Sequence, residues 1–295
     1  MCAGWGMGTD PAPLPPWDGT SWSNPPESNP LGVIHATYHS GIMRVDIGYN
    51  IYLPPQYFSN ENGRFPVVYF LHGINSNENS GTFIAAQLQN MISANTVAPM
   101  IIVFPNGGLN SKYMDAQNNS AMAYPWYMVQ KSLVSELIPF IDAKYRTIAD
   151  SGSRAVQGYS MGGMGCELLM FKFPQMFSSA YCFAPANHHS GSDILAREPK
   201  FALNMFNNDA NLFQANTVWA ISTNNASIIN GHPIHVTVGS LDGLLASNKM
   251  MNDHLTSKGI AHDALQIVRG CGHDLVCLEK AVSYANFTFA AAHFH

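Results

Sequence analysis

The chain has 295 residues, of which 46% are hydrophobic and only 11% are charged, and its formal net charge is -5. This length and hydrophobic content suit one large α/β domain with a single sizeable core. The chain has neither the clustered basic residues that nucleic-acid binding needs nor an apolar run of about 20 residues that could span a bilayer. We therefore expect a soluble globular protein without a nucleic-acid partner and without a transmembrane segment.

The first 30 residues are rich in proline and show no periodic pattern, which predicts an extended arm over residues 1–30. The remaining residues, 31–295, show no internal repeat and are expected to form one catalytic domain. The start of the chain, Met1 to Gly4, has neither the basic nor the apolar region of a signal peptide. Cys2 could be the acylated cysteine of a lipoprotein, and an incidental cysteine is the favoured alternative.

The scarcity of charge also bears on location, because uncharged Asn, Ser, Gly and Thr take the place of the missing charges. Asn-x-Ser/Thr sequons are acceptors for glycosylation in secreted proteins. The chain has three of them, at Asn118, Asn225 and Asn286. Together these features favour an extracellular location.

From residue 33 onward, short apolar runs alternate with amphipathic segments. Two alternating segments predict antiparallel strands, at Val33–Tyr38 and Val45–Leu53. Continuously apolar runs then predict buried parallel strands, at Val67–Leu71, Met100–Phe104, Tyr181–Ala184, Ile234–Val238 and Leu265–Val268. Helical patterns cover Val129–Tyr145, Met161–Phe173, Ser247–Lys258 and Val276–Ala291. The pattern predicts an α/β fold with a mixed, mostly parallel sheet and helices on both faces.

The five cysteines are too few and too scattered for a disulfide scaffold. Cys166 and Cys182 lie in apolar surroundings and are interpreted as small buried side chains without a bridge. Cys271 and Cys277 are six residues apart, so a local bridge between them is an open alternative.

A candidate nucleophile lies in the run from Gly158 to Gly162, which reads Gly-Tyr-Ser-Met-Gly. The motif G-x-S-x-G is short and can occur by chance, so its context decides how it is interpreted. Here it follows a short apolar segment and begins a helical pattern. A sharp turn from strand to helix exposes the serine hydroxyl and needs small neighbours. This context favours Ser160 as a nucleophile over a serine in an ordinary glycine-rich turn.

A serine nucleophile needs a base and an acid, which in the order Ser, Asp, His lie downstream at strand ends. Asp242 follows the strand predicted at Ile234–Val238, and His273 follows the strand predicted at Leu265–Val268. Two other acids compete for the role of Asp242. Asp274 is the better candidate for a helix N-cap, and Asp209 follows no clear strand.

The tetrahedral intermediate of acyl transfer also needs an oxyanion hole. Its donors are expected to be the N–H of Met161 and the N–H of Ile74, or less favourably of Gly73, in the turn after the strand at Val67–Leu71.

Several runs of the sequence, in this order, resemble the esterase D-like α/β-hydrolases, and the resemblance spans roughly residues 31–290. They are Tyr52–Pro55, Pro66–Gly73, Leu137–Ile141, Tyr145–Thr147, Gly158–Gly163, Gly239–Asp242 and Gly270–Asp274. That family includes feruloyl and acetyl-xylan carbohydrate esterases, S-formylglutathione hydrolases and mycolyltransferases. The resemblance implies Ile74 and Met161 as the oxyanion-hole residues. Plant cell-wall esterases often carry tryptophans just after the catalytic His-Asp, whereas this chain has Leu275 and Leu278.

The segment Asn106–Tyr127 is long for a connection between a strand and a helix, and long loops often carry function. Its aromatic residues Trp126 and Tyr127, together with Tyr159 beside the serine, are candidate substrate contacts. Packing of Trp126 beneath the loop is an equal alternative. His188 and His189 show no metal-ligand spacing, and we expect neither a metal nor a cofactor.

These observations predict a secreted serine carboxylesterase that acts on feruloyl or acetyl esters of plant cell-wall polysaccharides. The alternatives within the same chemistry are an S-formylglutathione hydrolase and a polyester depolymerase. A non-catalytic binding module on a hydrolase fold is the alternative from a different class.

Overall fold

The computed structural model describes residues 18–295 apart from residues 31, 118–126 and 188–190. Within these residues, eight strands form one sheet in the order β1-β2-β4-β3-β5-β6-β7-β8. The strands are β1 (Val33–Ser40), β2 (Val45–Tyr52), β3 (Val67–Leu71), β4 (Ile101–Pro105), β5 (Arg154–Tyr159), β6 (Ser179–Phe183), β7 (Ile234–Gly239) and β8 (Gln266–Val268). All the predicted strands are present, with ends that differ by at most a few residues.

The sheet is mixed, as the sequence predicts. The pairs β1–β2 and β2–β4 are antiparallel, and every other neighbouring pair, from β4–β3 to β7–β8, is parallel. All five residues of β3 and of β6 are buried because helices cover both faces of the central strands. This arrangement is the α/β-hydrolase architecture, so the predicted fold class is confirmed.

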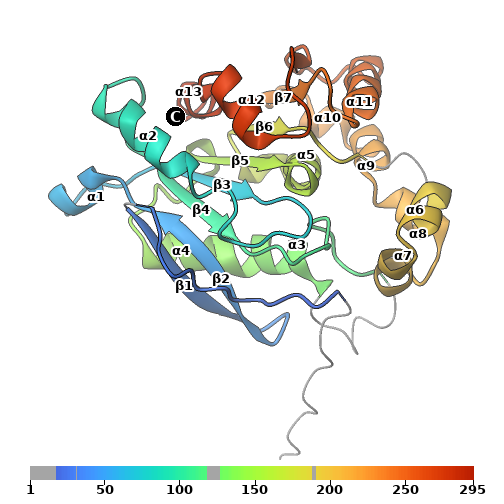
Figure 1. The fold of residues 1–295 in the computed structure, drawn as a ribbon, viewed down its shortest axis with the longest axis horizontal. Coiled ribbons are helices and arrows are strands. Elements are labelled where there is room, and N and C mark those ends of the chain that lie inside the picture. The colour runs from blue at the N-terminus through green and yellow to red at the C-terminus, as the bar shows by residue number, and fades with distance from the viewer. Residues whose placement is uncertain (1–17, 31, 118–126, 188–190) are drawn as a thin grey trace, which may run out of the picture.

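The helical segments alternate with the strands and are distributed over both faces of the sheet (Figure 1). They are α1 (Pro55–Ser59), α2 (Ile84–Ser93), α3 (Val129–Ser132), α4 (Ile138–Lys144), α5 (Met161–Lys172), α6 (Gly191–Arg197), α7 (Pro199–Phe206), α8 (Ala210–Ala215), α9 (Val218–Asn224), α10 (Ala226–Ile229), α11 (Leu245–Ser257), α12 (Leu275–Ala281) and α13 (Ala285–Ala292). Figure 1 shows α6, α7 and α8 together at the end of the molecule opposite α1 and α2.

The alternation of side chains along the strands divides the core into two parts. Val67, Tyr69 and Leu71 of β3 point to the side where α3, α4, α5 and α9 pack. Val68 and Phe70 point to the opposite side, where α2, α12 and α13 pack. Because successive side chains of a strand point to opposite faces, one apolar run contributes residues to both parts of the core.

Some helices differ from their predicted form. The segment predicted at Val129–Tyr145 is helical, but a π-helical turn over Leu133–Leu137 separates α3 from α4. The prediction of one continuous helix over Val276–Ala291 is wrong, because the chain turns between α12 and α13. Ser283 and Tyr284 both have positive φ there, which ends the first helix. The helices α1, α2 and α6 to α10 had no counterpart in the sequence analysis.

The interpretation of Cys166 and Cys182 as unbridged residues is wrong. They form a disulfide between α5 and β6, and both side chains are fully buried. Apolar surroundings describe a buried disulfide as well as a buried thiol, so composition alone did not separate the two.

Residues 18–24 of the proline-rich arm pack against the body of the protein. Trp22 is 6% exposed, and its carbonyl accepts a hydrogen bond from the Gly48 N–H. The Thr20 hydroxyl accepts from the Leu109 N–H at 2.9 Å, and an Asp18 carboxylate oxygen accepts from the Asn110 N–H. The arm therefore supports the loop that follows β4.

The turn from β5 into α5 leaves no room for a side chain at Gly162. A Cβ atom there would lie 2.0 Å from the Leu71 carbonyl oxygen, which is backbone and cannot rotate away. We predict that Gly162→Ala lowers the free energy of unfolding by about 3 kcal/mol, measured by urea denaturation. The control is Gly243→Ala, where nothing lies within 4 Å, and its effect should stay within about 1 kcal/mol. Equal midpoints for the two variants would contradict this packing.

Candidate active site

The backbone at Ser160 is held in a conformation that non-glycine residues rarely adopt. Ser160 has φ 60° and ψ -114°, between the end of β5 and the first turn of α5. Its N–H donates to the Phe183 carbonyl at 2.9 Å, and its carbonyl accepts from the N–H groups of Met164 and Ala186. Such strain costs about 1–3 kcal/mol and persists only where the surroundings enforce it. It is the geometry expected of a nucleophile elbow.

The structure brings Ser160, His273 and Asp242 into one hydrogen-bonded row. His273 Nδ1 lies 2.8 Å from Asp242 Oδ2, and His273 Nε2 lies 2.8 Å from Ser160 Oγ. A carboxylate only accepts, so Nδ1 carries the proton and donates to Asp242, and Ser160 Oγ–H donates to Nε2. The Asp242 side chain is 1% exposed, and its other oxygen accepts from the Leu244 N–H.

The two competing acids have structural positions instead. Asp274 caps α12, because its carboxylate accepts from the N–H groups of Val276 and Cys277. Asp209 caps α8 in the same way. Neither carboxylate is the one that meets His273.

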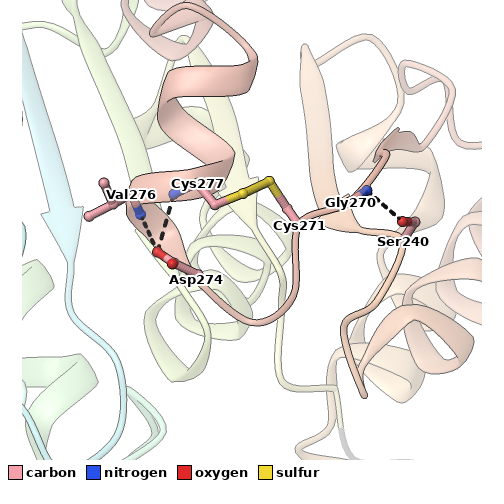
Figure 2. Close-up of a disulfide and its surroundings, with 6 residues drawn as sticks. All are labelled: Ser240, Gly270, Cys271, Asp274, Val276 and Cys277. Atoms are coloured by element: carbon pink, nitrogen blue, oxygen red, sulfur yellow. Dashed lines mark hydrogen bonds between the residues drawn. A yellow bond between two sulfur atoms is a disulfide. The ribbon is translucent and has the colours of Figure 1, made fainter.

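The loops that carry Asp242 and His273 are joined to each other. The Gly270 N–H donates to Ser240 Oγ at 2.9 Å, and the Leu241 N–H donates to the Cys271 carbonyl at 2.9 Å. A disulfide links Cys271 to Cys277, which closes the short loop between β8 and α12. Figure 2 shows this bridge between the loop and the first turn of α12, with the Asp274 cap beside it. The open alternative of a local bridge is thus the arrangement in the structure.

Ile74 and Met161, the residues predicted for the oxyanion hole, line one cavity together with Ser160. Among the described residues, neither N–H donates to a protein acceptor. His72 fixes the turn before Ile74: its Nδ1–H donates to the Gly73 carbonyl, and its Nε2 accepts from the Gly107 N–H at 2.9 Å. Burial lowers the pKa of His72 to about 4, so the ring stays neutral and keeps both hydrogen bonds.

Two cavities flank Ser160, and Ile74 and His273 line both. The first has a volume of about 360 Å³ and is lined mainly by apolar and aromatic groups, with two serine hydroxyls: Phe70, Ile74, Ser76, Ser80, Phe83, Tyr159 and Leu275. The second has a volume of about 440 Å³ and combines apolar groups with charged ones: Lys112, Met161, Met164, Glu198, Asp242 and Leu244. An ester carbonyl at Ser160 would have one cavity for each of its two substituents.

The residues predicted to contact the substrate lie in different parts of the structure. Tyr159 lines the first cavity, and its ring stacks on His273 with centroids 4.8 Å apart. Tyr127 is 2% exposed, belongs to the hydrophobic core, and lines neither cavity. Trp126, like His188 and His189, lies outside the described residues.

The sequence analysis missed the charged pair of the second cavity. Lys112 Nζ lies 2.9 Å from Glu198 Oε1, and the lysine side chain is only 3% exposed. A signal was available, because Lys112 is a basic residue within a long aromatic-rich loop of a chain with only 14 Lys and Arg. Its partner Glu198 is 86 residues away, at the N-cap of the unpredicted helix α7, and no local pattern indicates that pairing.

Comparison with known proteins identifies the family of the chain. The model of the Esterase family matches residues 40–274. An esterase of Mycobacterium tuberculosis is 32% identical over 152 residues, which cover 51% of this chain and 30% of that protein. The endo-1,4-beta-xylanase/feruloyl esterase of Xylanibacter ruminicola is 35% identical over 134 residues, which cover 43% of this chain and 18% of that protein. The chain thus spans less than a third of the length of either relative.

Solved structures show the same fold. A ferulic acid esterase superposes with a TM-score of 0.74 at 22% identity, covering 89% of this chain and 98% of that one. An S-formylglutathione hydrolase from Agrobacterium tumefaciens superposes with a TM-score of 0.72 at 16% identity, covering 91% and 98%.

The fold and these comparisons define an α/β-hydrolase of the carboxylesterase class. The chain belongs to the Esterase family, because the family model matches well over half of its length. The predicted class, an ester hydrolase, is confirmed at the level of that family. Among the described residues, no helix has the length and apolar character that crossing a membrane requires.

The Cys271–Cys277 bridge holds the segment that carries His273, so we predict that Cys277→Ser lowers esterase activity and thermal stability together. Closure of so short a loop contributes about 2 kcal/mol in the chain-entropy model. The assay is hydrolysis of p-nitrophenyl acetate beside a thermal melt, with labelling of Ser160 by an organophosphate to show that the serine remains accessible. Free reaction of both thiols with an alkylating agent in the unreduced native protein would exclude the bridge.

Proposed function

We propose that this chain is a secreted serine carboxylesterase that hydrolyses plant cell-wall polysaccharide esters through Ser160, His273 and Asp242. The observation that carries the proposal is the hydrogen-bonded row of these three side chains at the junction of the two cavities. Residues 31–295 act as one catalytic domain in this proposal.

The mechanism follows from the positions of the donors and acceptors. His273 Nε2 takes the proton of the Ser160 hydroxyl as Oγ attacks the ester carbonyl, and Asp242 stabilises the imidazolium that forms. The N–H groups of Ile74 and Met161 donate to the developing oxyanion. His273 then donates its proton to the leaving alcohol, and an acyl-enzyme remains on Ser160. Water, activated by the same histidine, hydrolyses this intermediate.

The first cavity favours a feruloyl over an acetyl group as the acyl part. Its volume of about 360 Å³ lies in the range of cavities that enclose whole small molecules, and an acetyl group would fill little of it. The rings of Phe70, Phe83 and Tyr159 can pack against a phenylpropenoid ring. The hydroxyls of Ser76 and Ser80 offer partners for phenolic substituents. The relative from Xylanibacter ruminicola, a xylanase/feruloyl esterase, supports the same substrate class.

Two observations bear on secretion. Disulfides form and persist in oxidising compartments, and the structure has two of them, Cys166–Cys182 and Cys271–Cys277. The sequon at Asn286 contributes nothing, because that side chain is fully buried. Asn118 and Cys2 lie outside the described residues. Fractionation of the source cells tests the location, and recovery of the protein in the reducing cytosol would contradict it.

The substrate class is tested with methyl ferulate, acetyl-xylan and S-formylglutathione at equal protein concentration. We predict the highest kcat/KM for methyl ferulate, because its aromatic acyl group fills the first cavity. A preference for S-formylglutathione would move the function to the thioesterase alternative. If the protein hydrolyses none of the three substrates and does not hydrolyse p-nitrophenyl acetate either, the non-catalytic binding module is favoured.

The roles of the three residues are tested by substitution. We predict that Ser160→Ala lowers kcat by a factor on the order of 10⁴–10⁶, and that Asp242→Asn lowers it by about 10⁴ because His273 loses the acceptor that fixes its tautomer. Asp274→Asn is the matched control, since asparagine caps a helix as well as aspartate does. A larger loss from Asp274→Asn than from Asp242→Asn would assign the acid to Asp274. Circular dichroism verifies that each variant is folded.

A further inference from the structure

Lys112 and Glu198, which line the second cavity, belong to a partly buried polar cluster that the reaction itself does not need. Lys112 Nζ donates to Glu198 Oε1 at 2.9 Å and to Asn110 Oδ1 at 3.1 Å, and it lies 4.7 Å from the centre of the Phe201 ring. Asn110 Nδ2 donates to Glu198 Oε2 at 2.9 Å. An ammonium group has three donors, so one donor remains beyond these two bonds.

The backbone that presents Lys112 is strained and rigidly packed. Lys112 and Tyr113 both have a φ of 54°, a conformation that side chains with a Cβ rarely adopt. The Tyr113 ring is fully buried against Gly107 and Gly165, where a Cβ atom would lie 2.3 and 2.6 Å from the ring. Strain of this kind persists at ligand sites, where the surrounding packing holds a side chain in one position.

The cluster shares its cavity with the reacting groups. Lys112 and Glu198 line the same space of about 440 Å³ as Ser160 and His273. The acyl group has the aromatic cavity on the other side of Ser160. The second cavity is therefore the place for the alcohol part of the ester.

The charges of this cavity disfavour an anionic alcohol or thiol. Among its described lining residues, Lys112 is the one lysine or arginine, whereas Glu198 and Asp242 are both carboxylates. The lysine is already paired with Glu198, so an incoming carboxylate would meet no uncompensated cation. Neutral hydroxyl groups can instead accept from the ammonium and donate to the carboxylate, without the desolvation cost of a further charge.

We propose that Lys112, Glu198 and Asn110 form a subsite for the hydroxyl groups of a neutral saccharide, the alcohol part of the ester that Ser160 cleaves. This inference rests on the proposed function and adds to it the groups that select the alcohol. Lys112 and Glu198 determine specificity and take no part in bond cleavage.

The test compares two esters that share one acyl group, methyl ferulate and a feruloylated arabinoxylo-oligosaccharide. The measured quantity is the ratio of kcat/KM for the oligosaccharide ester to kcat/KM for methyl ferulate. Lys112→Met keeps the aliphatic stem and removes the donors, and Glu198→Gln keeps the shape and removes the charge. Each should lower the ratio about 10–100-fold, mainly through KM, because a hydrogen bond to a charged group is lost. Lys200→Met is the control: Lys200 is exposed in the first turn of α7, two residues after Glu198, and its replacement should leave the ratio unchanged.

A second measurement covers the case in which the variants do not fold. In the unaltered protein, the oligosaccharide without its feruloyl group should inhibit methyl ferulate hydrolysis competitively. Absence of this inhibition, together with equal kcat/KM for the two esters, would overturn the subsite while the esterase function stands. The Lys112 and Glu198 variants should also leave the ratio of kcat/KM for methyl ferulate to kcat/KM for methyl cinnamate unchanged. A fall in that ratio would show that these residues contact the phenolic acyl group, and it would overturn the saccharide subsite. If the unaltered protein hydrolyses neither ester, the proposed function itself fails, and the subsite with it.

Discussion

The site depends on how closely the first turn of α5 approaches the ends of β3 and β6. Gly162 lies against the Leu71 carbonyl, and Gly163 lies against the Phe183 carbonyl, with no space for a Cβ atom at either position. The Ser160 N–H reaches Phe183 from the same turn. These backbone contacts hold the serine in its strained positive-φ conformation and direct its hydroxyl toward His273. One turn further along, the Cys166–Cys182 disulfide attaches the helix covalently to β6.

The chain has few charges, and it buries several of them at the carboxyl edge of the sheet. The Asp242 and Lys112 side chains are 1% and 3% exposed. Glu78 is fully buried and accepts from the side chains of Asn24 and Asn106. Buried charges cost several kcal/mol each unless partners compensate them. The burial of Asp242 and Lys112 beside Ser160 indicates that this edge serves binding and chemistry more than stability.

Sequence reasoning reached the parts of the protein that local patterns encode. Apolar runs such as Val67–Leu71 predict the strands, and Gly158 and Gly162 on either side of Ser160 predict the sharp turn. Both predictions need only residues that are close together in the sequence. The Lys112–Glu198 pair and the Cys166–Cys182 bridge join residues distant in the chain, and only the folded sheet brings them together. Tyr127 shows the opposite limit: an aromatic residue in a long loop is as suitable for the core as for a ligand, and here it lies in the core.

The packing of residues 18–24 has a consequence for where the protein can be trimmed. A fragment that starts at residue 31 keeps every strand and all of the groups around Ser160. It would lose the acceptors that Asp18 and Thr20 provide for the loop after β4, and the two contacts of Asn24 with Glu78. The buried carboxylate of Glu78 would then lose two of its hydrogen-bond donors. For crystallisation or fusion to another module, the natural starting point therefore lies at or before Asp18.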